Sequence, residues 1–544
     1  MTESIQINLI QYAFLVGDIK ANAEKIITLA ERSRQSGADL VVFPELALTG
    51  YPPEDLLLRQ GFIDQVEQAV QHITQSVVGV DVVFGSIHQD GNHLYNSAFW
   101  IRDGQLLDVY NKTTLPNYAV FDEKRYFTAG ERPVVVSVKG IKVGLSICED
   151  IWSAQSAELA QQAGAQALII INASPYHYGK DNERIEVLQR RHRETGMALF
   201  YLNLVGGQDE LVFDGESLVL DAEGQLAGRG PVFDAAQLQY RLHASGKVEA
   251  IDTELCSPAS EEASVYKALV TSVRDYVTNN GFDGVVIGLS GGVDSALTLA
   301  IAADALGADQ VHAVMMPSRY TAQMSLNDAR EQAEILGVDY REISIEPTFN
   351  AFLETMQDSF ENTEADTTEE NIQARCRGVI LMALSNKLRR MVLTTGNKSE
   401  MAVGYSTLYG DMAGGFAPLK DVFKVLVYRL CEYRNSLSRV IPQRVLDRPP
   451  SAELKPDQVD QDSLPDYSVL DAILKMSVEQ DKPRAEIIAA GYDAETVDRV
   501  VAMVQFNEYK RRQAPPGVRI TRRAFGRDRR YPITSGYRRN QAEN

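Results

Sequence analysis

The segment GLSGGVDSA, residues 288–296, lies between the apolar run GVVIGLS (284–290) and the Ala- and Leu-rich run SALTLAIAADALG (295–307). The first run is typical of a buried strand and the second of a helix, so together they predict a strand–turn–helix unit. Gly291 and Gly292 permit a tight turn whose backbone N–H groups can point at phosphate oxygens. The N-terminus of the following helix also favours an anion. The segment therefore predicts a phosphate-binding loop in an α/β domain.

Three side chains of this loop add chemistry. Ser290 and Ser295 can donate hydroxyl hydrogen bonds to phosphate. Asp294 repels a bare phosphate, so the physically sensible role for its carboxylate is through a divalent cation. The loop does not have the G-x-x-x-x-G-K-[ST] spacing, which disfavours a γ-phosphate transferase of the Walker type. The alternative is a glycine turn capped by Asp and Ser that binds nothing.

Outward from the loop, helical and strand patterns alternate. A helix is predicted over 263–281, and further strands are predicted over 311–318, 340–345 and 390–397. This order predicts a doubly wound parallel sheet. Between the last two strands, residues 359–388 begin as an acidic polar run, which we expect to form an exposed loop, and then become helical. A last helix is predicted over 495–512.

The N-terminal part of the chain shows a similar alternation and predicts a second α/β layered domain over residues 1–240. Its apolar strands include DVVFGSI (81–87) and ALIIINAS (167–174). Residues 241–262 lose the apolar period and gain small polar and acidic residues, so we place a linker there. The second domain then covers 263–544 and ends in a basic segment.

Composition limits the classes of function. In 544 residues, 54 Lys and Arg stand against 74 Asp and Glu, and the net charge of −20 argues against a surface that binds nucleic acid or an anionic membrane throughout. No apolar run approaches the roughly 18 residues that span a bilayer, and the first residues lack a signal-peptide pattern. Only four cysteines occur, and none forms a C-x-x-C pair. We expect a cytoplasmic protein.

The loop resembles that of the PP-loop ATP pyrophosphatase family, whose members adenylate a substrate and release pyrophosphate. The resemblance implies an adenine nucleotide alpha hydrolase-like fold and gives a reaction type without a substrate. It also implies that the whole loop binds ATP, through Gly288, Leu289, Ser290, Gly291, Gly292, Val293, Asp294 and Ser295.

Three separated segments of the N-terminal domain carry reactive side chains. Glu45 lies in FPELALTGY, Lys112 in YNKTTLPNY, and Cys148 in SICEDIW at the end of a predicted strand. A thiol at a strand end can attack a carbonyl if a base removes its proton and a cation stabilises the developing oxyanion. Taken singly, such a cysteine is more often a buried apolar group, and such a Glu or Lys is more often solvated. Together they predict an amidase.

These three contexts, in this order, resemble the nitrilase (carbon-nitrogen hydrolase) family. The resemblance implies an α-β-β-α sandwich in which Glu45 accepts a proton, Lys112 stabilises the tetrahedral intermediate and Cys148 is acylated. It further implies that Glu123 helps to orient Lys112. For a glutamine substrate it implies binding residues, which are Tyr118, Glu123, Ser174 and Lys180.

A nitrilase-type amidase followed by a PP-loop domain resembles the arrangement of the glutamine-dependent NAD synthetase family. The resemblance implies that ammonia from glutamine aminates an adenylated carboxylate, converting deamido-NAD to NAD with ATP as co-substrate and Mg²⁺ as cofactor. It implies small-molecule partners, no prosthetic group, no nucleic acid or membrane partner, and a homo-oligomer.

The same resemblance assigns further residues of the second domain. Thr395 and Lys424 are expected to contact ATP, and Asp294 and Glu400 to hold the metal. The residues expected to bind deamido-NAD are Asn371, Arg375, Glu400, Asp411 and Lys510. Without the resemblance, Thr395 could equally be a strand-end cap and Asn371 a helix N-cap.

The basic segment raises a different class of function. Residues 510–539 hold eleven Lys and Arg and one acid, with interspersed aromatics, a pattern that could bind RNA. A segment that closes over polyphosphate or docks on an acidic neighbouring subunit explains the same charge. Two more functions stay open: an amidase that feeds another adenylated carboxylate, and a nucleotide-sensing or RNA-binding protein without catalysis. The complete set of Glu45, Lys112, Cys148 and SGGVDS opposes the last.

Overall fold

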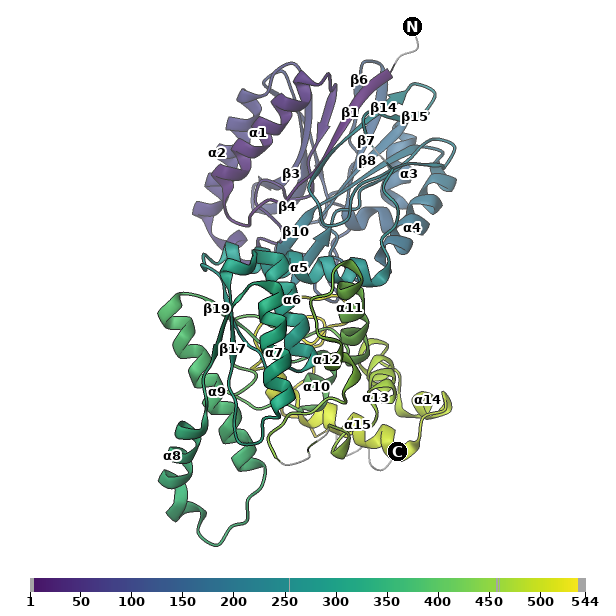
Figure 1. Cartoon of the computed structure of the whole chain (residues 1–544). Coiled ribbons are helices and arrows are strands. Elements are labelled where there is room, and N and C mark those ends of the chain that lie inside the picture. The colour runs from purple at the N-terminus through teal and green to yellow at the C-terminus, as the bar shows by residue number, and fades with distance from the viewer. Residues whose placement is uncertain (1–3, 254, 456–457, 459, 537–544) are drawn as a thin grey trace. The chain divides into compact units, whose positions relative to one another are not determined.

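The computed structural model describes residues 4–253, 255–455, 458 and 460–536. The chain divides into two compact units, the first of Met1–Gln208 and Val212–Glu261 and the second of Asp209–Leu211 and Glu262–Asn544. Both contain helices and strands, so the α/β class is confirmed (Figure 1). The ends of the two expected domains, residues 1–3 and 537–544, and Glu254 of the expected linker lie outside the described residues.

The first unit contains two large sheets and a small hairpin. The seven-stranded sheet has the order β15-β14-β1-β2-β3-β4-β5 and the six-stranded sheet the order β13-β12-β9-β8-β7-β6. The strands of the first sheet are β1 (Ser4–Gln11), β2 (Leu40–Val42), β3 (Asp81–Asp90), β4 (His93–Arg102), β5 (Gln105–Asn111), β14 (Ala236–His243) and β15 (Val248–Ala250). Those of the second are β6 (Val135–Val138), β7 (Ile141–Ile147), β8 (Ala167–Asn172), β9 (Ala198–Asn203), β12 (Leu218–Leu220) and β13 (Leu226–Arg229), and the hairpin pairs β10 (Val205–Gln208) with β11 (Leu211–Asp214).

Strand β8 shows how this unit is layered. Ile169 and Ile171 pack in the core shared by strands of both large sheets, whereas Leu168 and Ile170 pack in a second core beneath helices α3 (Gln155–Gln162) and α4 (Lys180–Thr195). Because successive strand side chains point to opposite faces, a strand covered on both faces reads as an unbroken apolar run.

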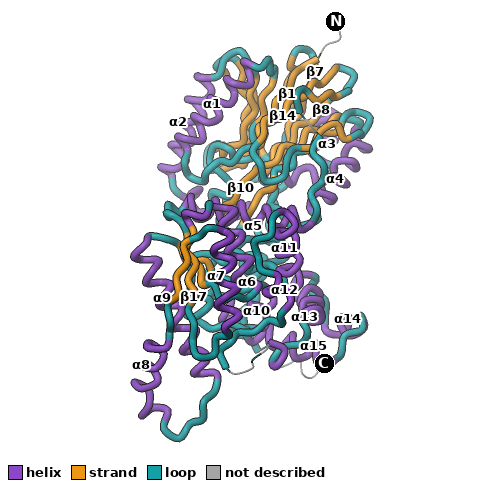
Figure 2. Tube along the Cα trace, in the orientation of Figure 1, coloured by secondary structure: helices purple, strands orange, loops and turns teal. Residues whose placement is uncertain are grey.

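The helices of the first unit complete the layers. In Figure 2, α1 and α2 flank the strands on one side and α3 and α4 on the other, which is the expected α-β-β-α sandwich. The four helices are α1 (Ile19–Gln35), α2 (Gln60–Ser76), α3 (Gln155–Gln162) and α4 (Lys180–Thr195). Short helical turns are η1 (Glu54–Leu58), η2 (Glu123–Arg125) and η3 (Cys148–Trp152).

The segment expected to be a linker is partly sheet. Strand β14 continues to His243 and pairs with β15, so residues 241–243 and 248–250 belong to the first sheet. Helix α5 (Glu261–Asn279) then begins. The sequence pattern missed β15 because a three-residue edge strand has too few side chains to show a period.

The second unit is built on a four-stranded sheet with the order β18-β17-β16-β19, in which all neighbours are parallel. Its strands are β16 (Val285–Gly288), β17 (Val311–Met315), β18 (Asp339–Glu342) and β19 (Met391–Leu393). The expected parallel sheet is therefore confirmed, although β18 ends before the predicted Ile345. The chain runs outward from β16 through β17 to β18 and returns to the other side of β16 as β19. This reversal is the place at which open α/β sheets bind ligands.

Helices cover this sheet on both faces. Val286 and Val314 share an apolar cluster with Ile345, Phe349 and side chains of α9, while α6, buried almost all round, packs against β16 and β17. The helices that surround the sheet are α6 (Val293–Leu306), α7 (Gln323–Leu336), α8 (Glu346–Met356), α9 (Thr367–Leu388) and α11 (Lys424–Leu437).

The remaining elements follow the sheet in the chain. They are α10 (Lys398–Val403), α12 (Gln443–Asp447), α13 (Tyr467–Leu474), α14 (Arg484–Ala489), α15 (Ala494–Phe506), α16 (Glu508–Arg511) and the short turns η4 (Ala308–Gln310), η5 (Gln357–Phe360), η6 (Asp460–Asp462) and η7 (Lys475–Glu479). The predicted helix over 495–512 is thus broken at Asn507, whose buried amide donates a hydrogen bond to the Val403 carbonyl at 2.8 Å. Among the described residues, no helix is long and apolar enough to cross a membrane.

The layered core predicts where truncation destabilises the first unit. Leu168→Ala removes apolar atoms from a fully buried site and should lower the free energy of unfolding by about 2–5 kcal/mol. Leu58→Ala is the matched control, since Leu58 is 63% exposed, and it should change that free energy by less than about 0.5 kcal/mol. Urea unfolding followed by circular dichroism measures both, and equal losses for the two variants would contradict the assignment of this core.

Candidate functional site

The first candidate site lies where three segments of the first unit meet. Glu45 follows β2, Lys112 follows β5 directly, and Cys148 follows β7 directly as the first residue of η3. Lys112 Nζ donates to Glu45 Oε1 at 2.8 Å, and the charges of both side chains influence the pKa of the Cys148 thiol. All three are buried. The structure therefore brings together the three residues that the sequence analysis named.

The Glu45 carboxylate is held from three directions. Besides Lys112, the Asn96 amide donates to Oε1 at 2.7 Å and the Ala173 N–H donates to Oε2 at 2.8 Å. Strand β3 passes very close to this turn at Gly85, where a Cβ would lie 2.2 Å from the backbone nitrogen of Leu46. Only glycine fits there, so the packing of β3 helps to set the position of the carboxylate.

Lys112 is paired with a second buried carboxylate. Its Nζ donates to Glu123 Oε1 at 2.8 Å, as expected if Glu123 orients the lysine. Burial by itself would lower the pKa of Lys112, but the charges of Glu123 and Glu45 outweigh it and raise that pKa well above its ordinary value. Burial raises the pKa of Glu123 to about 7. Lys112 is thus a permanent buried cation.

Cys148 has an unusual backbone and a protonated thiol. Its φ is 45°, in the left-handed region that non-glycine residues seldom adopt, and such strain is concentrated at functional sites. Burial, followed by the negative charge of Glu45, raises the pKa of the thiol well above its ordinary value. The thiol therefore needs a neighbouring base before it can act as a nucleophile.

Asp150, which the sequence analysis did not single out, ties the cysteine turn to the lysine segment. Its Oδ1 accepts hydrogen bonds from the Thr113 N–H at 3.0 Å and the Thr114 N–H at 2.7 Å. Its Oδ2 accepts from the Tyr110 hydroxyl at 2.8 Å and the Ile147 N–H at 3.1 Å. An aspartate two positions after a strand-end cysteine looks like an ordinary helix cap, so the sequence carried no sign of these long-range bonds.

Two of the residues expected to bind glutamine contact residues 149–152, which directly follow Cys148. The Tyr118 hydroxyl donates to Glu149 Oε1 at 3.0 Å, and Glu149 is the residue after Cys148. Lys180 Nζ lies 3.1 Å from Glu183 Oε2 and 4.1 Å from the centre of the Trp152 ring.

Ser174, the remaining expected glutamine contact, is fixed by a buried arginine. Arg184 Nη2 donates to the Ser174 carbonyl at 3.1 Å, while Arg184 Nη1 donates to Asp214 Oδ2 at 2.6 Å. The Ser174 N–H donates to Asn203 Oδ1 at 3.0 Å. Sequence reasoning missed these supporting residues because they are far apart in the chain.

The second candidate site begins at the loop between β16 and α6. Gly291 has a φ of 78°, and a Cβ there would lie 2.4 Å from the Ser325 carbonyl oxygen, so this turn requires glycine. The Ser290 N–H donates to Ser295 Oγ at 3.2 Å, and the Gly292 N–H donates to Ser290 Oγ at 3.2 Å. No side chain caps the N-terminus of α6, which leaves that end open to a ligand.

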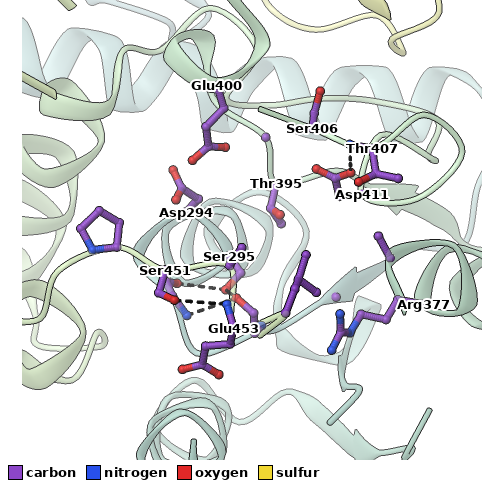
Figure 3. A pocket seen from close by; sticks show the side chains of 18 of the residues that line it. Asp294, Ser295, Arg377, Thr395, Glu400, Ser406, Thr407, Asp411, Ser451 and Glu453 are labelled. Carbon is purple, nitrogen blue, oxygen red and sulfur yellow. Dashed lines mark hydrogen bonds between the residues drawn. The ribbon is translucent and has the colours of Figure 1, made fainter. Parts of the chain in front are cut away.

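This loop opens into a cavity of about 1090 Å³ at the carboxyl ends of β16, β17 and β19 (Figure 3). Of the expected site residues, those that line it are Gly288, Leu289, Ser290, Gly292, Val293, Asp294, Ser295, Asn371, Thr395, Glu400, Asp411, Lys424 and Lys510. Gly291 and Arg375 are not among the lining residues. Arg375 is exposed, and its Nε donates to the Leu408 carbonyl at 3.2 Å.

Two carboxylates and a lysine meet in this cavity. Lys424 Nζ donates to Asp294 Oδ2 at 2.5 Å and to Glu400 Oε1 at 3.0 Å, and Figure 3 shows the two carboxylates directed toward each other. Burial raises the pKa of Glu400 to about 8. Burial alone would lower the pKa of Lys424, but the charges of Asp294 and Glu400 raise it above its ordinary value.

The two carboxylates fit a magnesium ion only in part. Their oxygens are the ligands that Mg²⁺ prefers. No group of three or more His, Cys, Asp or Glu that could hold a metal occurs within the described part of the chain. A metal bound by Asp294 and Glu400 would therefore take further oxygens from a ligand such as a polyphosphate, which is the usual way in which proteins bind Mg²⁺.

A further part of the cavity carries the other expected contacts. Asp411 Oδ1 accepts a hydrogen bond from the Thr407 N–H at 2.6 Å (Figure 3). The Thr407 hydroxyl donates to Asn371 Oδ1 at 2.8 Å. Burial raises the pKa of Asp411 to about 6. Lys510 Nζ donates to the carbonyls of Gly404 at 2.9 Å and Ser406 at 3.1 Å.

Several lining residues were not foreseen. Arg448 donates through Nη1 to Ser325 Oγ at 2.8 Å and through Nη2 to the Gly291 carbonyl, so it contacts the phosphate loop itself. Glu453 Oε1 accepts from Ser325 Oγ at 2.6 Å. The proline pair in RPPSAELK (448–455) indicates a loop, but nothing in that segment singled out Arg448 or Glu453 or specified a ligand.

Comparison with known proteins matches each part of the chain to a family. The carbon-nitrogen hydrolase family model matches residues 4–240, and the NAD synthase family model matches residues 265–514. Glutamine-dependent NAD(+) synthetases from Acinetobacter baylyi and Xylella fastidiosa resemble almost the whole chain. The first is 49% identical and aligns over 98% of this chain and 99% of its own, and the second is 50% identical and aligns over 99% and 100%.

A solved structure gives the same result. The glutamine-dependent NAD(+) synthetase of Acinetobacter baumannii, determined in complex with ADP, has a TM-score of 0.80 and 46% identity, and the match covers 98% of this chain and 99% of that one. A Cytophaga hutchinsonii structure of the same name has a TM-score of 0.85 over 98% of both chains at 22% identity, which speaks for the fold alone.

Glu123 gives the first unit a testable dependence on pH. Its pKa is about 7 in the folded protein and has an ordinary value of 4.5, so between these values the folded state holds a proton that the unfolded chain has lost. Stability contributed by this group is therefore present below pH 4.5 and is lost as the pH rises toward 7. Glu123→Gln cannot ionise and should flatten the decline of the melting temperature over that window.

The measurement is thermal unfolding of wild type and variant at several pH values. Glu131→Gln, at an exposed position, is the control and should follow the wild-type curve. If Glu123→Gln also ran parallel to wild type, the buried carboxyl would not titrate in this range.

Proposed function

This chain belongs to the glutamine-dependent NAD(+) synthetase family, and we propose that its two sites divide the reaction between them. Residues 1–240, together with the strand pair that continues to Ala250, hydrolyse glutamine, and residues 251–260 are the linker. Residues 261–544 use ATP and the released ammonia to convert deamido-NAD to NAD. The observation that carries the proposal is the presence in one chain of a buried Cys–Glu–Lys site and a phosphate loop that opens into a large cavity.

In the first site we assign Cys148 as the nucleophile. Glu45 accepts the thiol proton, and the sulfur attacks the carboxamide carbon of glutamine. Lys112 stabilises the oxyanion of the tetrahedral intermediate, because its paired and buried ammonium keeps its charge. Glu45 returns the proton to the departing nitrogen, and ammonia leaves a thioester on Cys148. Water activated by Glu45 then releases glutamate. We assign Tyr118, Glu123, Ser174 and Lys180 to the glutamine pocket.

The second site forms the new amide in two steps. The nicotinate carboxylate of deamido-NAD attacks the α-phosphate of ATP, and pyrophosphate leaves. Ammonia then attacks the carbonyl of the resulting adenylate, which releases AMP and yields NAD. Adenylation is needed because a carboxylate is a poor electrophile and AMP is a good leaving group.

We assign the groups of the cavity to these substrates by their chemistry. Residues 288–295, with Thr395 and Lys424, bind ATP at the open N-terminus of α6, and Asp294 and Glu400 would hold Mg²⁺, whose charge offsets that of the polyphosphate. The residues assigned to deamido-NAD are Asn371, Arg375, Glu400, Asp411 and Lys510. Arg375 needs a change of side-chain position to reach the cavity, whereas Arg377 already lines it.

We also propose that the protein acts in the cytoplasm as a homo-oligomer. Cys148, Cys376 and Cys431 are buried free thiols, which supports a reducing compartment. The oligomer is an expectation from the family, and light scattering of the purified protein would measure it.

Cys148→Ala separates the two sites. Glutamine-driven NAD formation should fall at least about a thousandfold because the nucleophile is lost, while NAD formation from ammonium should stay at the wild-type rate. NAD and AMP are measured together with deamido-NAD, ATP and Mg²⁺ present. Cys256→Ala is the control and should leave both reactions unchanged. Undiminished use of glutamine by Cys148→Ala would remove this residue from the nucleophile role.

Asp294→Asn tests the second site. It keeps the shape of the side chain but loses the charge that faces Lys424 and the metal, so NAD formation from both nitrogen sources should fall by about a hundredfold or more. Hydrolysis of glutamine alone should persist. Asp309→Asn, at an exposed position of the same unit, should behave as wild type. Full ammonium-driven turnover by Asp294→Asn would contradict its assignment to the metal and phosphate site.

A further inference from the structure

The C-terminal segment of the second unit is buried beyond the region that the NAD synthase family model matches. That match ends at residue 514, yet Val518, Ile520 and Thr521 are almost inaccessible to solvent. None of the described residues after Lys510 lines the cavity. The segment is therefore packed like a part of the core while it lies outside both the shared domain and the substrate cavity.

Asp421 is the residue that receives this segment. Its Oδ2 accepts hydrogen bonds from the Ile520 N–H at 2.8 Å, the Thr521 N–H at 2.8 Å and the Thr521 hydroxyl at 2.9 Å. Asp421 is itself buried. A buried carboxylate that accepts several hydrogen bonds holds its partners in one arrangement, because losing any of them leaves charge unsatisfied.

Lys398 completes the same cluster from a different part of the chain. Its Nζ lies 2.7 Å from Asp421 Oδ1, donates to Thr521 Oγ1 at 2.9 Å and donates to the Arg523 carbonyl at 3.1 Å. A fourth contact joins Nζ to Glu479 Oε1 at 2.6 Å, so the ammonium is paired with two carboxylates. The side chain is fully buried, so its ammonium depends on these partners. We call Lys398, Asp421 and residues 520–523 the clasp.

Lys398 and Asp421, the two clasp residues outside the C-terminal segment, are close in sequence to residues that line the cavity. Lys398 follows Asn397, whose amide donates to Asp294 Oδ1 at 2.8 Å, and precedes Glu400 by two residues. Asp421 precedes Lys424 by three residues. The Lys398 N–H donates to the Val422 carbonyl at 2.9 Å, which ties the two stretches together.

We propose that the clasp positions Asp294, Glu400 and Lys424, so that the C-terminal segment is a required part of the ATP and metal site without touching either ligand. Lys398 sets the start of α10 and hence Asn397 and Glu400, while Asp421 sets the start of α11 and hence Lys424. Thr521 joins the two through its N–H and hydroxyl. This inference rests on the proposed function only in taking the cavity as the synthetase site.

The basic charge of the segment fits this role. Arg523 pairs with Asp481, Arg519 Nε lies 2.7 Å from Asp528 Oδ2, and Arg529 Nη1 lies 2.5 Å from Glu508 Oε2. These acids belong to the same unit. At Arg523 and Arg529, the positive charge that raised the question of RNA binding thus fastens the segment to the rest of its own unit, whereas the Arg519–Asp528 pair lies within the segment.

Thr521→Val tests the proposal in the full-length enzyme, because it removes the hydroxyl that bridges Asp421 and Lys398 while keeping the size of the side chain. In ammonium-driven NAD formation, the KM for ATP and the Mg²⁺ concentration for half-maximal rate should rise by about 10- to 100-fold, the usual effect of losing a residue that orients a metal ligand. Thr521→Ser keeps the hydroxyl, so its KM for ATP and its Mg²⁺ requirement should equal those of the wild type. Hydrolysis of glutamine alone should stay at the wild-type rate in both variants. Thr271→Val, at another buried threonine of the unit, is the matched control.

Hydrogen–deuterium exchange without substrates supplies a readout that does not depend on catalysis. The amides of 397–403 should exchange faster in Thr521→Val and at the wild-type rate in Thr521→Ser and Thr271→Val. If Thr521→Val fails to fold, Asp421→Asn is measured in the same way. The proposal would be overturned if the folded variant, Thr521→Val or Asp421→Asn, kept the wild-type KM for ATP, Mg²⁺ requirement and exchange rates. Equal defects in Thr271→Val would also overturn it. A wild-type enzyme that makes no NAD from ammonium would instead contradict the proposed function, while the exchange experiment still decides on the clasp.

Discussion

A buried ammonium held between two carboxylates occurs in both units, and the geometry of each site depends on it. Lys112 lies between Glu45 and Glu123, and Lys424 lies between Asp294 and Glu400. Taking such charges out of water is costly unless every one of them is paired and hydrogen-bonded. Each lysine therefore fixes two carboxylates at a definite separation, and each carboxylate keeps the lysine charged. The charge that catalysis needs is in place before a substrate arrives.

Around these centres the two sites differ in a way that matches their substrates. In the first, the three reactive side chains are buried and supported by carboxylates such as Asp150, which binds two segments at once. The second opens into a cavity of about 1090 Å³ at the reversal point of a parallel sheet, which has room for a dinucleotide beside a nucleoside triphosphate. Asp421 plays there the organising part that Asp150 plays in the first site.

Fold class and motifs could be predicted from the sequence because they depend on local patterns. The strand, glycine turn and helix at 284–307 are contiguous, and so are the apolar runs that became β8 and β9. Predictions failed where a local pattern was too short or was overruled by tertiary contacts. Strand β15 has only three residues. The helix expected over 495–512 breaks at Asn507, whose side-chain amide donates a hydrogen bond to the Val403 carbonyl.

The sequence by itself determined the kinds of reactive group, their order and the two α/β domains that carry them. Only the tertiary structure decided which groups meet. Glu45, Lys112 and Cys148 are brought together because the ends of β2, β5 and β7 lie at one end of the sandwich. Asp294, Glu400 and Lys424 meet because the segments that follow β16 and β19 lie on the two sides of one reversal point. The supporting residues Asn96, Asp150, Arg448 and Asp421 had no sequence signature, since a hydrogen bond between residues far apart in the chain leaves no periodic trace. The physical reason is that burial and pairing of charge are properties of three-dimensional packing, whereas sequence patterns record only neighbours along the chain.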